Sequence, residues 1–192
     1  MLRIVLVRPG CTEFDEQQRI QGSLNLPLSL AGVEQAVAAA RDLGAHELAV
    51  VYVAPEEAAV QTAELLAKPH QIKVKELEGL ANLDHGLWHG KLLSEVRQQQ
   101  PKVYRQWQEH PETVCPPGGE TLQAARERAR KALLKIIKKH KKGMVAIVVS
   151  EPMASMVQSL VCDAELGDLW QGSLNCGQWV VLDVMPERAG AI

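Results

Sequence analysis

Short apolar runs rich in β-branched residues recur along the chain and are separated by amphipathic stretches. Four such runs cover residues Leu2–Val7, Leu48–Val53, Met144–Val149 and Trp179–Val184. Runs in which successive positions are all apolar are typical of strands buried on both faces, as in a parallel sheet. The pattern therefore predicts an α/β protein with three layers, α/β/α, around a mostly parallel central sheet.

Three of the intervening stretches carry helix signals. Ser29 is placed to cap an alanine-rich helix that stops at Gly44. A second helix is predicted from Glu56 to Ala67 and a third, with a long apolar stripe, from Thr121 to Lys142. Helices that alternate with strands in this way are what the connections of a parallel sheet require.

Chain length and net charge indicate how many domains the protein has and which partners it does not bind. The 192 residues suit one domain over residues 1–192, with residues 186–192 as a frayed tail. A net charge of −2 gives no bulk attraction to nucleic acid or to an anionic membrane. No apolar run reaches membrane-spanning length, and the N-terminal run is too short for a signal peptide. We therefore expect a cytoplasmic protein with neither a nucleic-acid nor a membrane partner.

The four cysteines are scattered, and none forms a C-x-x-C pair. They are Cys11, Cys115, Cys162 and Cys176. This pattern favours reduced thiols over a disulfide framework or a zinc site. We expect no metal and no cofactor.

Several short motifs follow one another in a fixed order. An apolar strand runs into Arg8-Pro9-Gly10, and the later motifs are Arg19-Ile20-Gln21-Gly22, Pro27–Ala36, Gln61-Thr62-Ala63, Gly86–Gly90 and Pro116–Thr121. Together they resemble the histidine phosphatase (phosphoglycerate-mutase-like) superfamily, whose motifs include R-H-G, R-x-Q-G, Q-T-A, G-x-W-E-G and P-P-G-G-E-S. The resemblance implies a phosphoglycerate-mutase-like fold in which residues 91–117 form a lid-like insertion over the pocket.

The resemblance also implies which residues stand at the family's phosphate-handling positions. Arg8 is kept as the first phosphate-binding arginine, but Pro9 stands where the family has its nucleophilic histidine, and proline has no nucleophilic side chain. The other pocket positions are Asp15 for an asparagine, Ala58 for the second arginine, Asn82 for the proton-donating carboxylate and Glu151 for the second histidine, with Arg19, Gln21 and Gly22 beside them. The resemblance therefore implies that no catalytic residue is intact.

The topology predicts that these positions meet. In open α/β sheets, ligands bind beyond the carboxyl ends of the strands, and Arg8, Ala58 and Glu151 each follow a predicted strand. Ala58 removes one cationic donor from this crevice and Glu151 adds an anion, so phosphate is expected to bind weakly or not at all. We expect the carboxylate of Glu151 to pair with the guanidinium of Arg8 instead, through a bidentate contact.

Other chemical groups have plainer interpretations. His85 and His89 are four residues apart, but the glycines at 86 and 90 indicate a loop, so packing histidines are favoured over a metal pair. Cys11 lacks the arginine six residues later that cysteine phosphatases use. The basic run Lys138–Lys142 closes a long helix, where cations stabilise the helix dipole.

Two functional hypotheses follow. The favoured one is a catalytically inactive histidine phosphatase-like protein, a pseudoenzyme with a binding, scaffold or regulatory role. Its partner would be a small molecule or a protein, and a homodimer is left open. The alternative is a phosphatase or mutase-like enzyme with residual or altered phosphoester chemistry in the same crevice.

Overall fold

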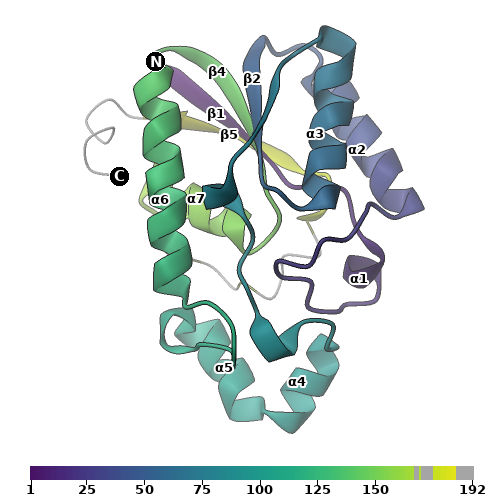
Figure 1. Cartoon of the computed structure of the whole chain (residues 1–192), viewed down its shortest axis with the longest axis vertical. Coiled ribbons are helices and arrows are strands. Elements are labelled where there is room, and N and C mark those ends of the chain that lie inside the picture. Colours follow the sequence, from purple (N-terminus) through teal and green to yellow (C-terminus); the bar gives the residue numbers. More distant parts are fainter. Residues whose placement is uncertain (167–168, 170–174, 185–192) are drawn as a thin grey trace.

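The computed structural model describes residues 1–166, 169 and 175–184. A five-stranded sheet with the order β3-β2-β4-β1-β5 forms its centre (Figure 1). Four strands are mutually parallel, and only β5 runs antiparallel, against β1. The strands are β1 (Leu2–Val7), β2 (Leu48–Val53), β3 (Val74–Glu76), β4 (Gly143–Val148) and β5 (Trp179–Val184). The predicted mostly parallel sheet is confirmed, while the predicted frayed tail lies outside the described residues.

Helices cover both faces of this sheet. The α-helices are α1 (Glu13–Glu16), α2 (Leu30–Leu43), α3 (Glu57–Ala67), α4 (Leu93–Gln99), α5 (Pro101–Glu109), α6 (Leu122–Lys139) and α7 (Met153–Cys162), and the short 3₁₀ turns are η1 (Lys68–His70), η2 (Glu78–Leu80), η3 (Gly86–Trp88) and η4 (Pro111–Thr113). One face carries α2 and α3, and the other carries α6 and α7 (Figure 1). Residues 4–7 of β1 and 145–148 of β4 are each fully buried, as expected of strands covered on both sides.

Capping residues in the sequence set where the two longest helices begin. The Ser29 hydroxyl accepts a hydrogen bond from the Gly32 N–H, so α2 begins where the capping residue predicts. The same arrangement caps α6, where the Thr121 hydroxyl accepts from the Ala124 N–H. However, α6 ends at Lys139 rather than Lys142, because His140 is already extended and Gly143, with φ +91°, turns the chain into β4.

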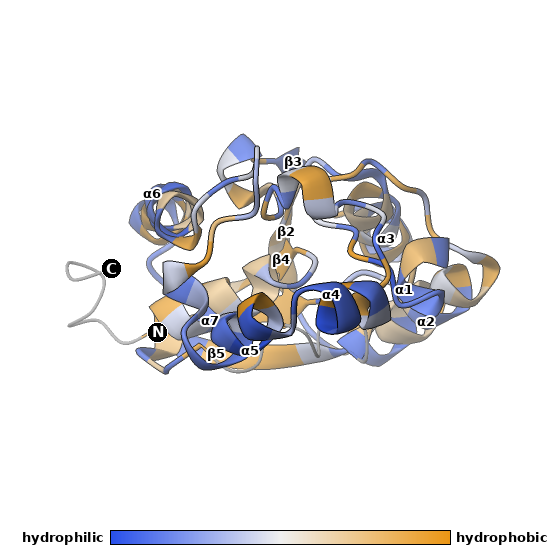
Figure 2. Cartoon of the chain, turned by 90° about the horizontal axis from the view of Figure 1, so that it is seen from below, coloured by the Kyte–Doolittle hydropathy of each residue, from blue (hydrophilic) through white to orange (hydrophobic). Residues whose placement is uncertain are grey.

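The carboxyl ends of the parallel strands point toward α4 and α5. Seen from that end, the two helices lie across the sheet and carry mostly hydrophilic residues (Figure 2). Leu93 of α4 and Trp107 of α5 line the crevice at the strand ends. The segment that was predicted as a lid thus supplies one wall of this crevice. Among the described residues, the structure contains no helix with the length and apolar character needed to span a membrane.

Candidate functional site

Arg8 and Glu151 meet at the head of the crevice. They follow the adjacent parallel strands β1 and β4, in which Val7 pairs with Val148. The Arg8 Nε–H donates to Glu151 Oε1 at 2.6 Å, and both side chains are largely buried. The predicted ion pair is confirmed, but it uses one N–H rather than the expected bidentate fork. The second carboxylate oxygen, Oε2, instead accepts the Ser155 N–H at 3.0 Å in the first turn of α7.

The buried side chain of Asn82 links three segments of the chain through hydrogen bonds. Its Nδ2 donates to the carbonyl oxygens of Gly22 at 3.0 Å and Glu151 at 2.8 Å, and its Oδ1 accepts the Met153 N–H at 3.3 Å. The side chain is 2% exposed. All its polar atoms are thus committed to holding the crevice walls, and an amide has no acidic proton to supply to a leaving group.

Arg128 of α6, which the sequence did not indicate as a site residue, holds the loop that carries Asn82. Its Nη2 donates to the Asn82 carbonyl oxygen at 2.9 Å, and its guanidinium forms two hydrogen bonds of 2.8 Å with the Glu120 carboxylate. The Asn82 N–H donates to Glu56 Oε1 at 2.7 Å. Glu56 is buried, and burial raises the pKa of its carboxyl above the usual range.

Pro9 and Ala58 fill the positions expected for the nucleophile and the second arginine. Both line the crevice. The Pro9 carbonyl accepts the Gly177 N–H at 2.8 Å, which ties the loop after β1 to the segment before β5. Ala58 is 1% exposed in the first turn of α3, and its N–H donates to the Leu26 carbonyl. Neither side chain has a group that binds or transfers a phosphoryl group.

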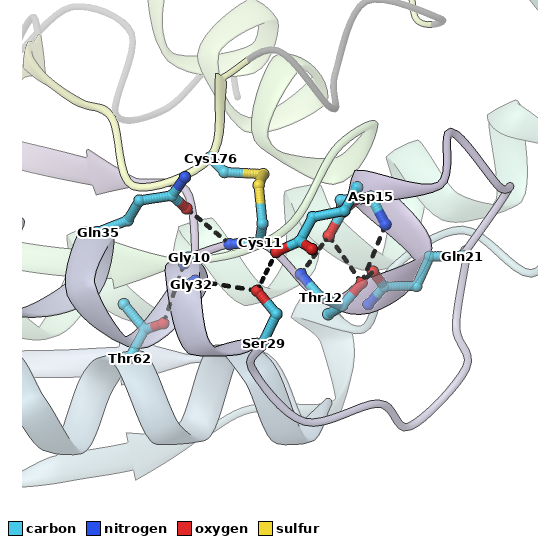
Figure 3. Close-up of a disulfide and its surroundings, with 11 residues drawn as sticks. Gly10, Cys11, Thr12, Asp15, Gln21, Ser29, Gly32, Gln35, Thr62 and Cys176 are labelled. Atoms are coloured by element: carbon cyan, nitrogen blue, oxygen red, sulfur yellow. Dashed lines mark hydrogen bonds between the residues drawn. A yellow bond between two sulfur atoms is a disulfide. The ribbon is translucent and has the colours of Figure 1, made fainter.

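Asp15 and Gln21 form a polar cluster around Thr12 (Figure 3). Asp15 Oδ2 accepts the Thr12 N–H at 2.8 Å, and the Thr12 hydroxyl lies 2.8 Å from Asp15 Oδ2 and 2.9 Å from Gln21 Oε1. Burial raises the pKa of Asp15, against the hydrogen bonds from Thr12, which lower it. Gln21 is 8% exposed and lines the crevice, and no described residue forms a hydrogen bond with its Nε2.

Arg19 and Gly22 complete the predicted set. Arg19 donates from Nη1 to the Gly90 carbonyl at 2.7 Å and from Nε to Gln17 Oε1 at 2.9 Å, so its guanidinium is anchored to the wall. Gly22 has φ +54°, and a Cβ there would lie 2.5 Å from His89 Nε2. Only glycine fits this turn without displacing His89.

His85 is a crevice residue that the sequence indicated only as a packing histidine. It is 5% exposed, and its ring lies 5.5 Å from the Trp107 ring, centroid to centroid. Burial first, and then neighbouring His89, lower the pKa of His85 to about 4, with Asp84 acting in the opposite direction. The ring is therefore neutral at physiological pH, and within the part of the chain that the structure describes its Nδ1 has no hydrogen-bond partner. Its position depends on Trp107 of the lid segment, which no local motif reveals.

The expectation of reduced cysteines is wrong for one pair. Cys11 and Cys176 form a disulfide with a Cα–Cα distance of 5.2 Å (Figure 3). The two residues are separated by 165 positions, so spacing in the sequence gave no sign that the loops after β1 and before β5 meet. Among the described residues, one group has the proximity to hold a metal ion, namely these two cysteines with Asp15. In the oxidised state both sulfurs are bonded to each other.

All nine predicted pocket residues except Asn82 line one crevice of about 80 Å³, together with Trp107 and His85. A family model described as the histidine phosphatase superfamily (branch 1) matches residues 4–191. The chain belongs to the histidine phosphatase superfamily.

Two relatives of this superfamily member are named as phosphoserine phosphatases. Phosphoserine phosphatase 1 of Hydrogenobacter thermophilus is 31% identical over 193 positions, which cover 100% of this chain and 90% of that protein. The metal-independent phosphoserine phosphatase of Arabidopsis thaliana is 32% identical over 179 positions, covering 90% of this chain and 74% of that protein. Among solved structures, Bacillus stearothermophilus YhfR superposes with a TM-score of 0.84 at 26% identity, covering 97% of this chain and 93% of that one. The phosphoglycerate-mutase-like fold is thereby confirmed.

Proposed function

We propose that this histidine phosphatase homologue is a binding protein whose crevice takes a small polar ligand without net negative charge, and that it transfers no phosphoryl group. The observation that carries the proposal is the 2.6 Å contact between Arg8 and Glu151. The carboxylate neutralises this guanidinium and takes its Nε–H, one of the donors that would otherwise hold phosphate. Pro9 beside it supplies no nucleophile.

The charges around the crevice support the same conclusion. Its lining contains two cations, Arg8 and Arg19, and two carboxylates, Asp15 and Glu151. Arg8 is paired with a carboxylate, and Arg19 donates to Gln17 and to the Gly90 carbonyl. A phosphate dianion at Arg8 would lie beside the carboxylate of Glu151, which repels it. To reach the Nε–H it would have to displace Glu151, which leaves a buried carboxylate without its partner at a cost of several kcal/mol.

Two buried polar atoms that have no partner among the described residues support the proposal that the crevice binds a ligand. Gln21 Nε2 is a donor, and Nδ1 of the neutral His85 ring is a donor or an acceptor according to its tautomer. Both side chains line the crevice and are more than nine-tenths buried. Buried polar groups of this kind are normally satisfied, so a ligand or ordered water is expected to complete them. The size of the crevice suits a ligand of a few non-hydrogen atoms.

The second candidate function is a phosphatase, which the names of the relatives favour. Such an enzyme would need a different nucleophile, and His85 supplies the imidazole that lines the crevice. In this candidate a ring nitrogen of neutral His85 attacks phosphorus, an N–P bond forms, and the P–O bond to the leaving alcohol breaks. Water then cleaves the N–P bond and releases phosphate.

The two candidates differ in turnover. Release of inorganic phosphate from p-nitrophenyl phosphate, phosphoserine and 3-phosphoglycerate should stay at the level of the buffer blank. Arg8→Ala and His85→Phe should leave that level unchanged. Turnover that is lost in both variants would overturn the proposal and establish the phosphatase. Turnover that persists unchanged in both variants would point to a contaminating enzyme and leave the proposal in place.

A further inference from the structure

The outer face of α2 is apolar where a surface helix is normally polar. The helix buries Gly32, Ala36, Ala39 and Leu43 against the rest of the protein. At 100° per residue, Leu30 and Val37 lie on the outer side of the helix and Val33 lies at its border with the buried side. The three are 90%, 43% and 41% exposed, in that order. These three residues, which we call the α2 stripe, are three of the five large apolar side chains exposed among the described residues.

The position of α2 leaves this stripe accessible. The helix packs against α3 and lies at the edge of the molecule in both views (Figures 1 and 2). The loop that carries Cys11 packs closely against the first turn of α2, where a Cβ on Gly32 would lie 2.0 Å from the Cys11 carbonyl oxygen. The inner side of the helix is therefore covered by the protein itself. None of Leu30, Val33 and Val37 lines the crevice.

Two charged residues on the same face of α2 indicate which kind of partner covers the α2 stripe. Glu34 and Arg41 lie within about 40° of Leu30 around the helix, and both are exposed. Neither side chain forms an ion pair or a hydrogen bond within the described part of the chain. They are seven residues apart, about two helical turns. An antiparallel copy of the same helix would therefore set Glu34 against Arg41 twice.

We propose that two copies of this chain associate through α2, antiparallel and about a two-fold axis near Val37. In such an isologous interface the two Val37 side chains meet at the centre. The Glu34 carboxylate of each copy faces the Arg41 guanidinium of the other, and the Leu30 side chains cover the ends of the contact. One opposite-charge pair within the face is sufficient because the symmetry duplicates it. A single helix pair buries less than a standard interface, so the dimer is expected to dissociate on dilution.

Sedimentation velocity of the full chain tests this proposal. Between about 1 and about 200 µM, the mass should shift from one chain toward two. Val37→Glu should weaken the dimer at least about tenfold, since it buries two like charges at the centre of the interface. Leu87→Glu is the matched control: this side chain is 71% exposed on η3, away from α2, and the change should have no effect.

A charge exchange makes the test independent of the folding of any one variant. Glu34→Arg and Arg41→Glu should each weaken the dimer about tenfold, because each sets like charges against one another. The double variant E34R/R41E should restore it to within about threefold, since the pairing is regenerated in reverse. A single-chain mass for the wild type at every concentration would overturn the proposal. A dimer that ignores Val37→Glu, or a double variant weaker than both single ones, would also overturn it.

Discussion

The guanidinium of Arg8 and the carboxylate of Glu151 lie 2.6 Å apart, joined across two adjacent strand ends and 143 positions of sequence. The pair is largely buried, so its net contribution to folding is small, but removal of one partner leaves an uncompensated charge. Glu151→Ala should therefore cost about 3 kcal/mol of unfolding free energy, and the double variant Arg8→Ala/Glu151→Ala should cost less. Thermal and urea unfolding measure both.

The pair Arg130–Glu127 on the outer face of α6 is the control for this experiment. Its two side chains are partly exposed and joined at 2.9 Å, so Glu127→Ala should change the melting temperature little. Two results would show that Glu151 does not compensate the charge of Arg8. One is a Glu151→Ala variant that is destabilised as little as Glu127→Ala, and the other is a double variant whose loss of unfolding free energy equals the sum of the two single losses.

Asn82 should tolerate no change to aspartate, although the two side chains have the same shape. A carboxylate has no N–H, so two oxygen-to-oxygen contacts would replace the bonds to the Gly22 and Glu151 carbonyls. We expect Asn82→Asp to lower the unfolding free energy by about 2–4 kcal/mol at pH 7. Asn25→Asp is the matched control, because the exposed Asn25 side chain only accepts, from the Glu57 N–H. Equal stability of the two variants would show that the hydrogen bonds donated by Asn82 do not stabilise the fold.

The strands and long helices were predictable because each carries its own local signal. Residues 4–7 are apolar at every position, and Ser29 and Thr121 provide caps. In contrast, β3 was missed because three residues that include Lys75 and Glu76 give no apolar pattern, and α7 because Pro152 precedes a stretch that also resembles a buried strand.

Within the site, what could be predicted was the set of positions that the motifs align. Arg8 and Glu151 follow strands that the family pattern places side by side, so their contact followed. The disulfide and the exposure of His85 to the crevice depend on segments that meet only in the folded chain. Cys176 precedes β5, and Trp107 comes from α5. No local pattern in the sequence encodes those two approaches.

His85 makes stability depend on pH. Its pKa is lowered from 6.5 to about 4 by burial and by His89, so the folded protein excludes a proton that the unfolded chain binds. The contribution is fully present above pH 6.5 and is lost as the pH falls toward 4, by about 3 kcal/mol at most. His85→Phe should lose less stability than the wild type between pH 6.5 and pH 4 when each is unfolded in urea. Parallel curves for the two proteins would contradict the assignment of a neutral, buried ring.

The Cys11–Cys176 disulfide closes a loop of 165 positions, so its loss should destabilise the folded protein. Dithiothreitol or Cys176→Ser should lower the unfolding free energy, by up to about 5 kcal/mol in the chain-entropy account. Cys115→Ser, at an exposed position, should have no such effect. The variant Cys176→Ser should not respond further to the reductant. If reduced and oxidised wild-type proteins unfold at the same temperature, the bridge does not stabilise the fold.

Phosphate binding measured by isothermal titration calorimetry tests the central claim most directly, namely that Glu151 neutralises Arg8 and takes a donor that phosphate would need. Wild-type protein should give no measurable heat of binding with inorganic phosphate at millimolar concentration. Glu151→Gln retains an acceptor for the Ser155 N–H and removes the negative charge beside Arg8, so phosphate should bind at least about tenfold more tightly than to the wild type. Submillimolar binding of phosphate to the wild type, without improvement in Glu151→Gln, would contradict the account.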